Sequence, residues 1–164
     1  MLVKIARNRG KPRGITAVEL LTLTVLLVIL AAFAIPGMSP VVLRQRLSGA
    51  AWQLAGDLRL ARQRAVTVRK RFRVCLTSCA IGVSAGSYSI ERDDGTVSTP
   101  NWVSETGVPV RLPPDVTATT TATATFTTTG MASGGTFTVS NIMGSYEIAV
   151  ASTGRVKVCQ GTCP

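Results

Sequence analysis

The 164-residue chain contains no histidine, and this absence excludes several kinds of chemistry. A histidine general base, a histidine-containing catalytic triad and any metal site that needs an imidazole ligand are all ruled out. The sequence also lacks a phosphate-binding loop and a recognisable nucleophile motif. We therefore expect a protein that is not an enzyme and that has no cofactor and no metal.

Acidic residues are scarce: eight Asp and Glu stand against 18 Lys and Arg, for a formal net charge of +10. The first fourteen residues hold no acid and five bases, namely Lys4, Arg7, Arg9, Lys11 and Arg13. If this segment is removed, half of the excess positive charge goes with it. The excess that remains favours an anionic partner.

Long apolar runs are absent except for one, from Ile15 to Ile35, in which Glu19 is the only charged residue. As a helix this run would be roughly 30 Å long, enough to cross a bilayer core. A secretory signal peptide is one interpretation, because Ala32-Phe33-Ala34 looks like a cleavage site. A plain membrane anchor is another. Neither accounts for Glu19, since a carboxylate inside a span costs about 2.5–3.5 kcal/mol.

A third interpretation uses every feature of this region. The sequence Gly14-Ile15-Thr16-Ala17-Val18-Glu19 resembles the class III signal of type IV pilins and type II secretion pseudopilins. The resemblance implies cleavage after Gly14 by a prepilin peptidase, N-methylation of Ile15, and pairing of Glu19 with the terminal amine of a neighbouring subunit. Phenylalanine is usual where this chain has Ile15. Pro36 falls where many pilins carry a helix-bending proline.

The charge before the apolar run predicts its orientation. Basic residues flanking the start of a span keep that side in the cytoplasm. The sequence therefore predicts a single-pass protein of the bacterial inner membrane with its head in the periplasm. Four segments follow: a leader at 1–14, a transmembrane and assembly helix at 15–35, an amphipathic stalk helix at 36–66 and a β-rich head at 67–164.

The stalk segment shows the spacing of one helical face, with apolar residues at steps of three and four. These are Leu43, Leu47, Ala50, Leu54, Leu58, Ala61 and Ala65. Pro36 predicts a kink. Gly49 and Gly56 weaken a helix by up to ~1 kcal/mol each relative to alanine. We expect Trp52, on the same helix, to pack in the core.

From Arg69 onward the period changes to two, which indicates strands. Phe72, Val74 and Leu76 share one face of the first strand. Turn residues separate further predicted strands at 83–91, 96–103, 107–112, 123–129, 135–141, 145–150 and 154–159. The threonine/alanine run 117–129 has too little apolar bulk to hold a core, so it predicts an exposed edge strand or a mobile loop.

Trp102, Tyr88 and Tyr146 are predicted to pack on the sheet rather than to bind a ligand. These segments together predict an α+β pilin fold. In that fold a long N-terminal helix, half transmembrane and half amphipathic, packs on a small antiparallel β-sheet head.

Two later segments resemble the FimT/GspH branch of minor pilins and pseudopilins. They are 60–66, followed by a strand ending Val74-Cys75-Leu76, and the late motif Gly154-Arg155-Val156-Lys157-Val158-Cys159. In some FimT-like proteins the late Gly-Arg motif helps to bind DNA during natural transformation. Lys157 stands where those proteins have a second arginine. Lysine keeps the attraction to phosphate but loses the bidentate fork.

The resemblance implies two functional hypotheses. The first is a minor pilin or pseudopilin that assembles with other pilins or pseudopilins into a type IV pilus or a type II secretion pseudopilus. The second is a minor pilin that binds double-stranded DNA for uptake through Arg155 and Lys157. The alternative for these two residues is a solvated strand at the edge of the domain. The sequence leaves open whether the filament is a pilus or a secretion pseudopilus.

A second basic cluster precedes and enters the first predicted strand: Arg69, Lys70, Arg71 and Arg73. It could form another DNA-binding patch. The interpretation we favour is a charged face against solvent or a neighbouring pilin.

Four cysteines, Cys75, Cys79, Cys159 and Cys163, allow three disulfide pairings. Their repeated spacing is also compatible with a zinc site of four thiolates. An oxidising compartment favours the local disulfides Cys75–Cys79 and Cys159–Cys163, with cross-pairing of the two segments as the next choice.

Overall fold

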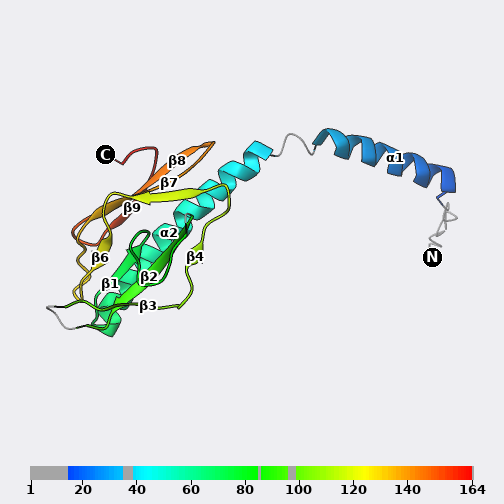
Figure 1. The fold of residues 1–164 in the computed structure, drawn as a ribbon. Helices are drawn as coiled ribbons and strands as arrows, with labels where there is room; N and C mark the ends of the chain where they lie inside the picture. The colour runs from blue at the N-terminus through cyan, green and yellow to red at the C-terminus, as the bar shows by residue number, and fades with distance from the viewer. Residues whose placement is uncertain (1–14, 35–38, 85, 96–98, 164) are drawn as a thin grey trace, which may run out of the picture. The chain divides into compact units, whose positions relative to one another are not determined.

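The computed structural model describes residues 15–34, 39–84, 86–95 and 99–163 (Figure 1). The chain divides into two compact units, residues 1–39 and 40–164. The predicted cleavage residue Gly14 and the predicted kink at Pro36 lie outside the described residues.

The first unit contains helix α1, Ala17–Ala34. Thr16 begins it, since its hydroxyl accepts a hydrogen bond from the Glu19 amide at 3.3 Å. Inside the helix the hydroxyls of Thr22 and Thr24 donate to carbonyls three residues earlier, which satisfies them locally. Among the described residues no helix is both long enough and apolar enough to cross a membrane, so the predicted span is not confirmed.

All but the first residue of the 30-residue helix α2, Ser39–Val68, belongs to the second unit. Six of the seven predicted face residues are buried, and Leu43, nearest the start, is half-buried. The helix ends at Arg69, whose φ of 55° is left-handed and breaks the hydrogen-bonding pattern.

Two antiparallel sheets follow α2. The first has the order β3-β2-β1-β6, with β4 also paired to β2; the second has the order β5-β7-β8-β9. The first sheet is formed by Phe72–Cys75 (β1), Ser87–Asp93 (β2), Trp102–Ser104 (β3), Val110–Arg111 (β4) and Ala124–Phe126 (β6). The second is formed by Thr117–Thr120 (β5), Gly135–Asn141 (β7), Gly144–Val150 (β8) and Val156–Gln160 (β9).

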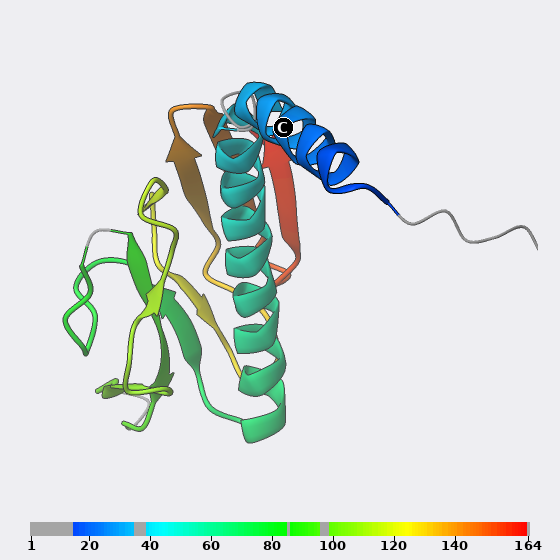
Figure 2. The ribbon, with the colours of Figure 1, turned by 90° about the vertical axis from the view of Figure 1, so that its right-hand side faces the viewer.

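One core joins α2 to both sheets. Leu54 and Leu58 of the helix lie in the same buried cluster as Phe72 and Val74 of β1 and Phe137 of β7. Figure 2 shows the helix running lengthwise in front of the strands, with its other side uncovered. The predicted α+β architecture, with a long helix packed on antiparallel sheet, is therefore confirmed, whereas the transmembrane half of the predicted fold is not.

The threonine/alanine run 117–129 is partly different from its prediction. Its first part, β5, is an edge strand as expected. Its second part, β6, crosses to the first sheet and buries Ala124 and Phe126 completely. β6 is also an edge strand, so the expectation was wrong only about exposure: Ala124 and Phe126 lie on the inner face of β6 and belong to the core.

The prediction that Trp52 packs in the core was also wrong. Its side chain is 55% exposed, on the side of α2 away from the sheets. The aromatic residue that fills this part of the core is Tyr88 of β2, which is fully buried. The hydroxyl of Tyr88 donates to Asp57 on α2 at 2.5 Å. Burial and this hydrogen bond raise the pKa of Tyr88 above its usual value.

Candidate functional site

The late Gly-Arg motif lies at an edge of the second sheet. Arg155 immediately precedes β9 and Lys157 lies within it, and both are exposed, whereas Val156 and Val158 pack against the core. This is the alternation predicted from the sequence. No hydrogen bond or ion pair joins either cationic side chain to any other described residue, so both charges are available to a ligand.

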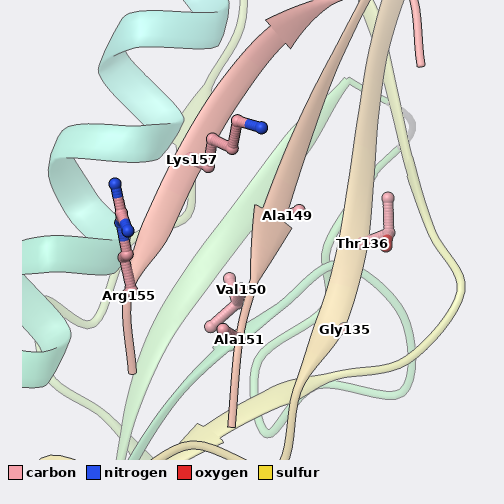
Figure 3. Close-up of a pocket in the computed structure, with 7 residues that line it drawn as sticks. All are labelled: Gly135, Thr136, Ala149, Val150, Ala151, Arg155 and Lys157. Carbon is pink, nitrogen blue, oxygen red and sulfur yellow. The ribbon is translucent and has the colours of Figure 1, made fainter. Parts of the chain in front are cut away.

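Three strands contribute to the surface beside the motif. Lys157 is the cross-strand neighbour of Ala149 on β8, which is the neighbour of Thr136 on β7. Figure 3 shows Lys157 rising from β9 toward Ala149, with Thr136 farther across the sheet. A shallow cavity of about 330 Å³ is lined by these residues together with Gly135, Val150, Ala151 and Arg155. Two cations and a hydroxyl around an open hollow suit an anion such as a phosphate.

The glycine of the motif is required by packing. Gly154 has a φ of 77°, a left-handed conformation, and a Cβ placed there would lie 2.1 Å from the carbonyl oxygen of Gly130. Arg62 of α2 fills the remaining space: its Nε donates to the Gly130 carbonyl at 2.9 Å and its Nη2 to the Thr153 carbonyl at 3.2 Å. Arg62 thus links the turn at Gly130 to the turn at Thr153, and the second of these turns directly precedes Arg155.

The second basic cluster is different because its charges are neutralised. Arg73 pairs with the fully buried Glu91 at 2.6 Å, and Arg71 pairs with Asp93 at 2.5 Å. Lys70 pairs with Asp94. Arg69, the exposed remaining member, makes no ion pair with another described residue. Three of the four positive charges of this cluster are therefore offset within the domain, while its roles as a DNA-binding patch or as a face against solvent or a neighbouring pilin remain predictions.

The carboxylates of this cluster have lowered pKa values. Burial alone would raise the pKa of Asp93, but hydrogen bonds from the amides of Gly95 and Asn101 and from Arg71 bring it below its usual value. Hydrogen bonds from Arg92 and Lys70 lower the pKa of Asp94 to about 2. Both groups are therefore charged at neutral pH, which keeps their basic partners neutralised.

Both local disulfides are present, Cys75–Cys79 with a Cα–Cα distance of 5.7 Å and Cys159–Cys163 with one of 5.3 Å. These are the two local pairings predicted first, and they leave no free cysteine among the described residues. The carboxylate of Glu91 lies close to Cys75 and Cys79. It accepts hydrogen bonds from Arg73 and from the amide of Ala80, so it anchors the first disulfide loop.

In the first unit, Glu19 lies in the first turn of α1 and is exposed. Its carboxylate has no hydrogen bond or ion pair with another described residue. Within the described part of the chain, an acid surrounded in sequence by apolar residues is therefore without an ionic partner.

The comparisons with known proteins agree with this architecture. A model of the family described as type II transport protein GspH matches residues 50–154. The chain belongs to the GspH family. No curated protein sequence matches the chain.

Solved structures show the same fold. The type IV minor pilin FimU of Pseudomonas aeruginosa matches with a TM-score of 0.50 and 21% identity, over 70% of this chain and 89% of that one. The minor pseudopilin EpsH of the type 2 secretion system of Vibrio cholerae matches with a TM-score of 0.55 and 11% identity, over 70% of this chain and 97% of that one. A second EpsH structure matches with a TM-score of 0.55 over 73% of this chain.

Two residues of the candidate site had not been identified from the sequence. Thr136 enters because the register of β7, β8 and β9 brings it into line with Lys157, and no local pattern shows that register. For Arg62 the sequence offered one indication: it lies between Leu58 and Ala65, two buried positions of α2, so a place near the buried face could be expected. Its contacts with turns about 70 and 90 residues away could not be predicted from helical periodicity.

Proposed function

We propose that this chain is a minor pilin or pseudopilin that is inserted in the bacterial inner membrane and assembles through its N-terminal helix into a type IV pilus or a type II secretion pseudopilus. The observation that carries the proposal is the exposed carboxylate of Glu19 at the start of an apolar helix, where it has no ion pair with another described residue. Prepilin peptidase cuts after Gly14, and the new terminus at Ile15 is methylated. The terminal amine of a neighbouring subunit then pairs with Glu19, because two charges that are each costly in lipid become tolerable as a pair.

The test uses the full-length chain in cells that make the filament. N-terminal sequencing of membrane-extracted protein is expected to begin at Ile15. Glu19→Gln should remove the chain from sheared filaments while its amount in the membrane stays unchanged, and Glu19→Asp, which keeps the charge, should retain part of the incorporation. A start at Ile35 would show signal-peptidase cleavage instead, and full incorporation of Glu19→Gln would contradict the role of the carboxylate.

A second candidate function is capture of double-stranded DNA by the exposed and unpartnered pair Arg155 and Lys157. The shallow cavity beside them, with the hydroxyl of Thr136, supports binding of a phosphate group. Contacts of this kind are independent of DNA sequence and weaken steeply with salt. In this case the protein is a DNA-binding subunit of a pilus used in natural transformation.

Mobility shifts with duplex DNA and the detergent-solubilised full-length chain test this candidate. We expect weak binding at low salt, and Arg155→Ala/Lys157→Ala should reduce the slope of log affinity against log salt by roughly two. The matched control is Arg44→Ala/Arg111→Ala, which removes two exposed charges that also have no ion pair with described residues. Equal losses in both double variants would mean that net charge, and not this motif, binds DNA.

A further inference from the structure

The turn between β7 and β8 has a composition that its geometry does not require. The strand register pairs Asn141 with Gly144, so Ile142 and Met143 alone form a two-residue turn. Turns of this length ordinarily carry Asn, Asp or Gly, because these residues suit the backbone angles and contact with water. Here both turn residues are apolar and exposed. Ile142, at 82%, is the most exposed large hydrophobic residue in the described part of the chain.

Asn141 fixes the place of this turn. Its Oδ1 accepts a hydrogen bond from the amide of Met143 at 2.8 Å, and its Nδ2 donates to the carbonyl of Leu43 at 3.0 Å. The first bond closes the turn, and the second fastens it to the beginning of α2. Figures 1 and 2 show the hairpin of β7 and β8 reaching the end of the head at which α2 begins. The apolar turn is therefore held at one end of the head.

The beginning of α2 adds apolar surface and positive charge at this end. Val41 and Val42 are exposed. Arg44 is also exposed, and it makes no ion pair with another described residue. The sequence has no Asp or Glu from 39 to 56 or from 135 to 146. This end of the head therefore combines exposed apolar side chains with an unneutralised base.

A shallow hollow of about 270 Å³ lies between the beginning of α2 and the strands β8 and β9. Its lining includes Arg44, Ser145 and Gln160, with Met143 beside them. A guanidinium, a hydroxyl and an amide are groups that donate hydrogen bonds to a phosphate. At a bilayer surface, apolar side chains enter the boundary of the acyl chains while bases meet the lipid phosphates. The turn and the hollow together match that layer.

The length of the connecting chain favours a bilayer over a protein as the partner. Helix α1 ends at Ala34, and the seven residues from there to Val41 span at most about 25 Å when fully extended. If α1 is inserted in the membrane, this end of the head stays within that reach of it. A second copy of the chain would bring a second Arg44 and no acid from these two segments, and like charges disfavour such a contact.

We propose that Ile142, Met143 and Arg44, which we call the lipid-contact turn, rest on the bilayer surface while the chain is in the membrane. Ile142 and Met143 enter the boundary of the acyl chains, and Arg44 binds a lipid phosphate in the hollow beside them. This inference rests on the proposed function as a membrane-inserted subunit. It goes further by giving the head a lipid contact of its own, separate from α1.

Photocross-linking tests the contact directly. The full-length chain with p-benzoylphenylalanine in place of Ile142 is reconstituted in vesicles of phosphatidylcholine and phosphatidylglycerol, irradiated, and analysed by mass spectrometry for lipid adducts. The control places the same group at Met131, an exposed apolar turn residue. Its neighbour Gly130 is bonded to Arg62, about 28 Å along α2 from Leu43. We expect roughly tenfold more lipid adduct at position 142 than at position 131.

The outcomes separate this inference from the function on which it rests. Equal adduct yields at the two positions, no adduct at position 142, or a cross-link from position 142 to a second copy of the chain would overturn the lipid contact. Carbonate extraction of the same vesicles reports whether α1 is inserted. A chain that carbonate removes from the vesicles would overturn membrane insertion and the lipid contact together.

The charge of Arg44 is tested by the same adduct yield. Arg44→Gln should lower the yield at position 142 about fivefold in vesicles that contain phosphatidylglycerol. The matched control is Arg111→Gln, which removes another exposed base that has no ion pair with a described residue. An equal fall in both variants would mean that net charge, and not Arg44, holds the turn at the surface.

Denaturation in detergent tests whether the apolar turn serves the fold instead. Ile142→Asn/Met143→Asn should leave the denaturant midpoint of the full-length chain nearly unchanged, because both side chains are exposed and asparagine suits the turn. A clear fall in the midpoint would show that Ile142 and Met143 stabilise the head itself. The proposal would then lose its main support, since the apolar composition of the turn would have an internal cause.

Discussion

The two basic regions of the head differ in what lies beside their charges. In the segment 69–73, three of four bases are paired with acids, whereas Arg155 and Lys157 make no ion pair with another described residue. The reason is strand register: Glu91 is the cross-strand neighbour of Arg73, and Asp93 follows two residues later to meet Arg71. Cross-strand pairs of opposite charge stabilise a sheet. The densest basic cluster in the sequence therefore contributes less free charge than the sparser one.

The largest expected effect on stability comes from removing a paired base of the segment 69–73. Arg73→Ala leaves the buried carboxylate of Glu91 without its cation and should lower the free energy of unfolding by about 3–5 kcal/mol. Arg155→Ala, at an exposed residue without a partner, should change it by less than about 0.5 kcal/mol. Urea denaturation of both variants measures the difference. Similar small losses for the two would mean that the pairing of Arg73 does not contribute to stability.

A smaller effect is expected at the turn before the second region. Gly154→Ala forces a side chain into a left-handed conformation, at a cost of about 1–2 kcal/mol, and the clash with the Gly130 carbonyl adds to it. Denaturant midpoints measure the loss, with Gly82→Ala as the control that adds a methyl group in open space. If Gly154→Ala were as stable as the control, Gly154 would not be packed closely against Arg62 and the Gly130 carbonyl, and this packing would not position Arg155.

The smallest effect is the response of the first region to acid. The pKa of Asp94 is lowered to about 2, and that of Asp93 is also lowered. Carboxylates with a lowered folded-state pKa stabilise the protein above their unfolded pKa, near 4, and lose this contribution as the pH falls toward 2. Thermal melts between pH 5 and pH 2 should show falling stability, with a smaller fall in Asp94→Asn. Identical stability profiles for the wild type and Asp94→Asn would show that the ion pairs of Asp94 with Lys70 and Arg92 do not contribute to stability.

Much of the fold could be predicted because its signals are local. The helical spacing from Leu47 to Ala65 indicated the buried face of α2, and the alternation around Phe72 and Val74 indicated β1. Strand β7 has the bounds predicted for it, 135–141. The prediction for Trp52 was wrong because the helical spacing of the buried residues of α2 places position 52 on the opposite side of the helix, whatever the hydrophobicity of its side chain. For the run 117–129 the predicted edge strand is present, but its expected exposure was wrong at β6, where Phe126 is fully buried.

The candidate site was predictable only in part. The alternation of Arg155, Val156 and Lys157 was evident from the order of residues, and the structure has it. Its neighbours Thr136 and Arg62 come from strands and helices distant in sequence, and their positions depend on register and packing. The same dependence explains the cluster at 69–73, whose acidic partners lie about 20 residues later, on β2 and directly after it.

By itself, the sequence determined the apolar helix with Glu19, the amphipathic helix and the strands, because periodicity and charge act over a few residues. It also indicated the family, because the motifs at 14–19 and 154–159 are continuous segments. The tertiary structure decided which charges are free and which surfaces are uncovered, since these depend on contacts between residues far apart in the chain. That is why Arg73 is neutralised, why Arg155 and Lys157 make no ion pair with another described residue, and why Trp52 faces outward.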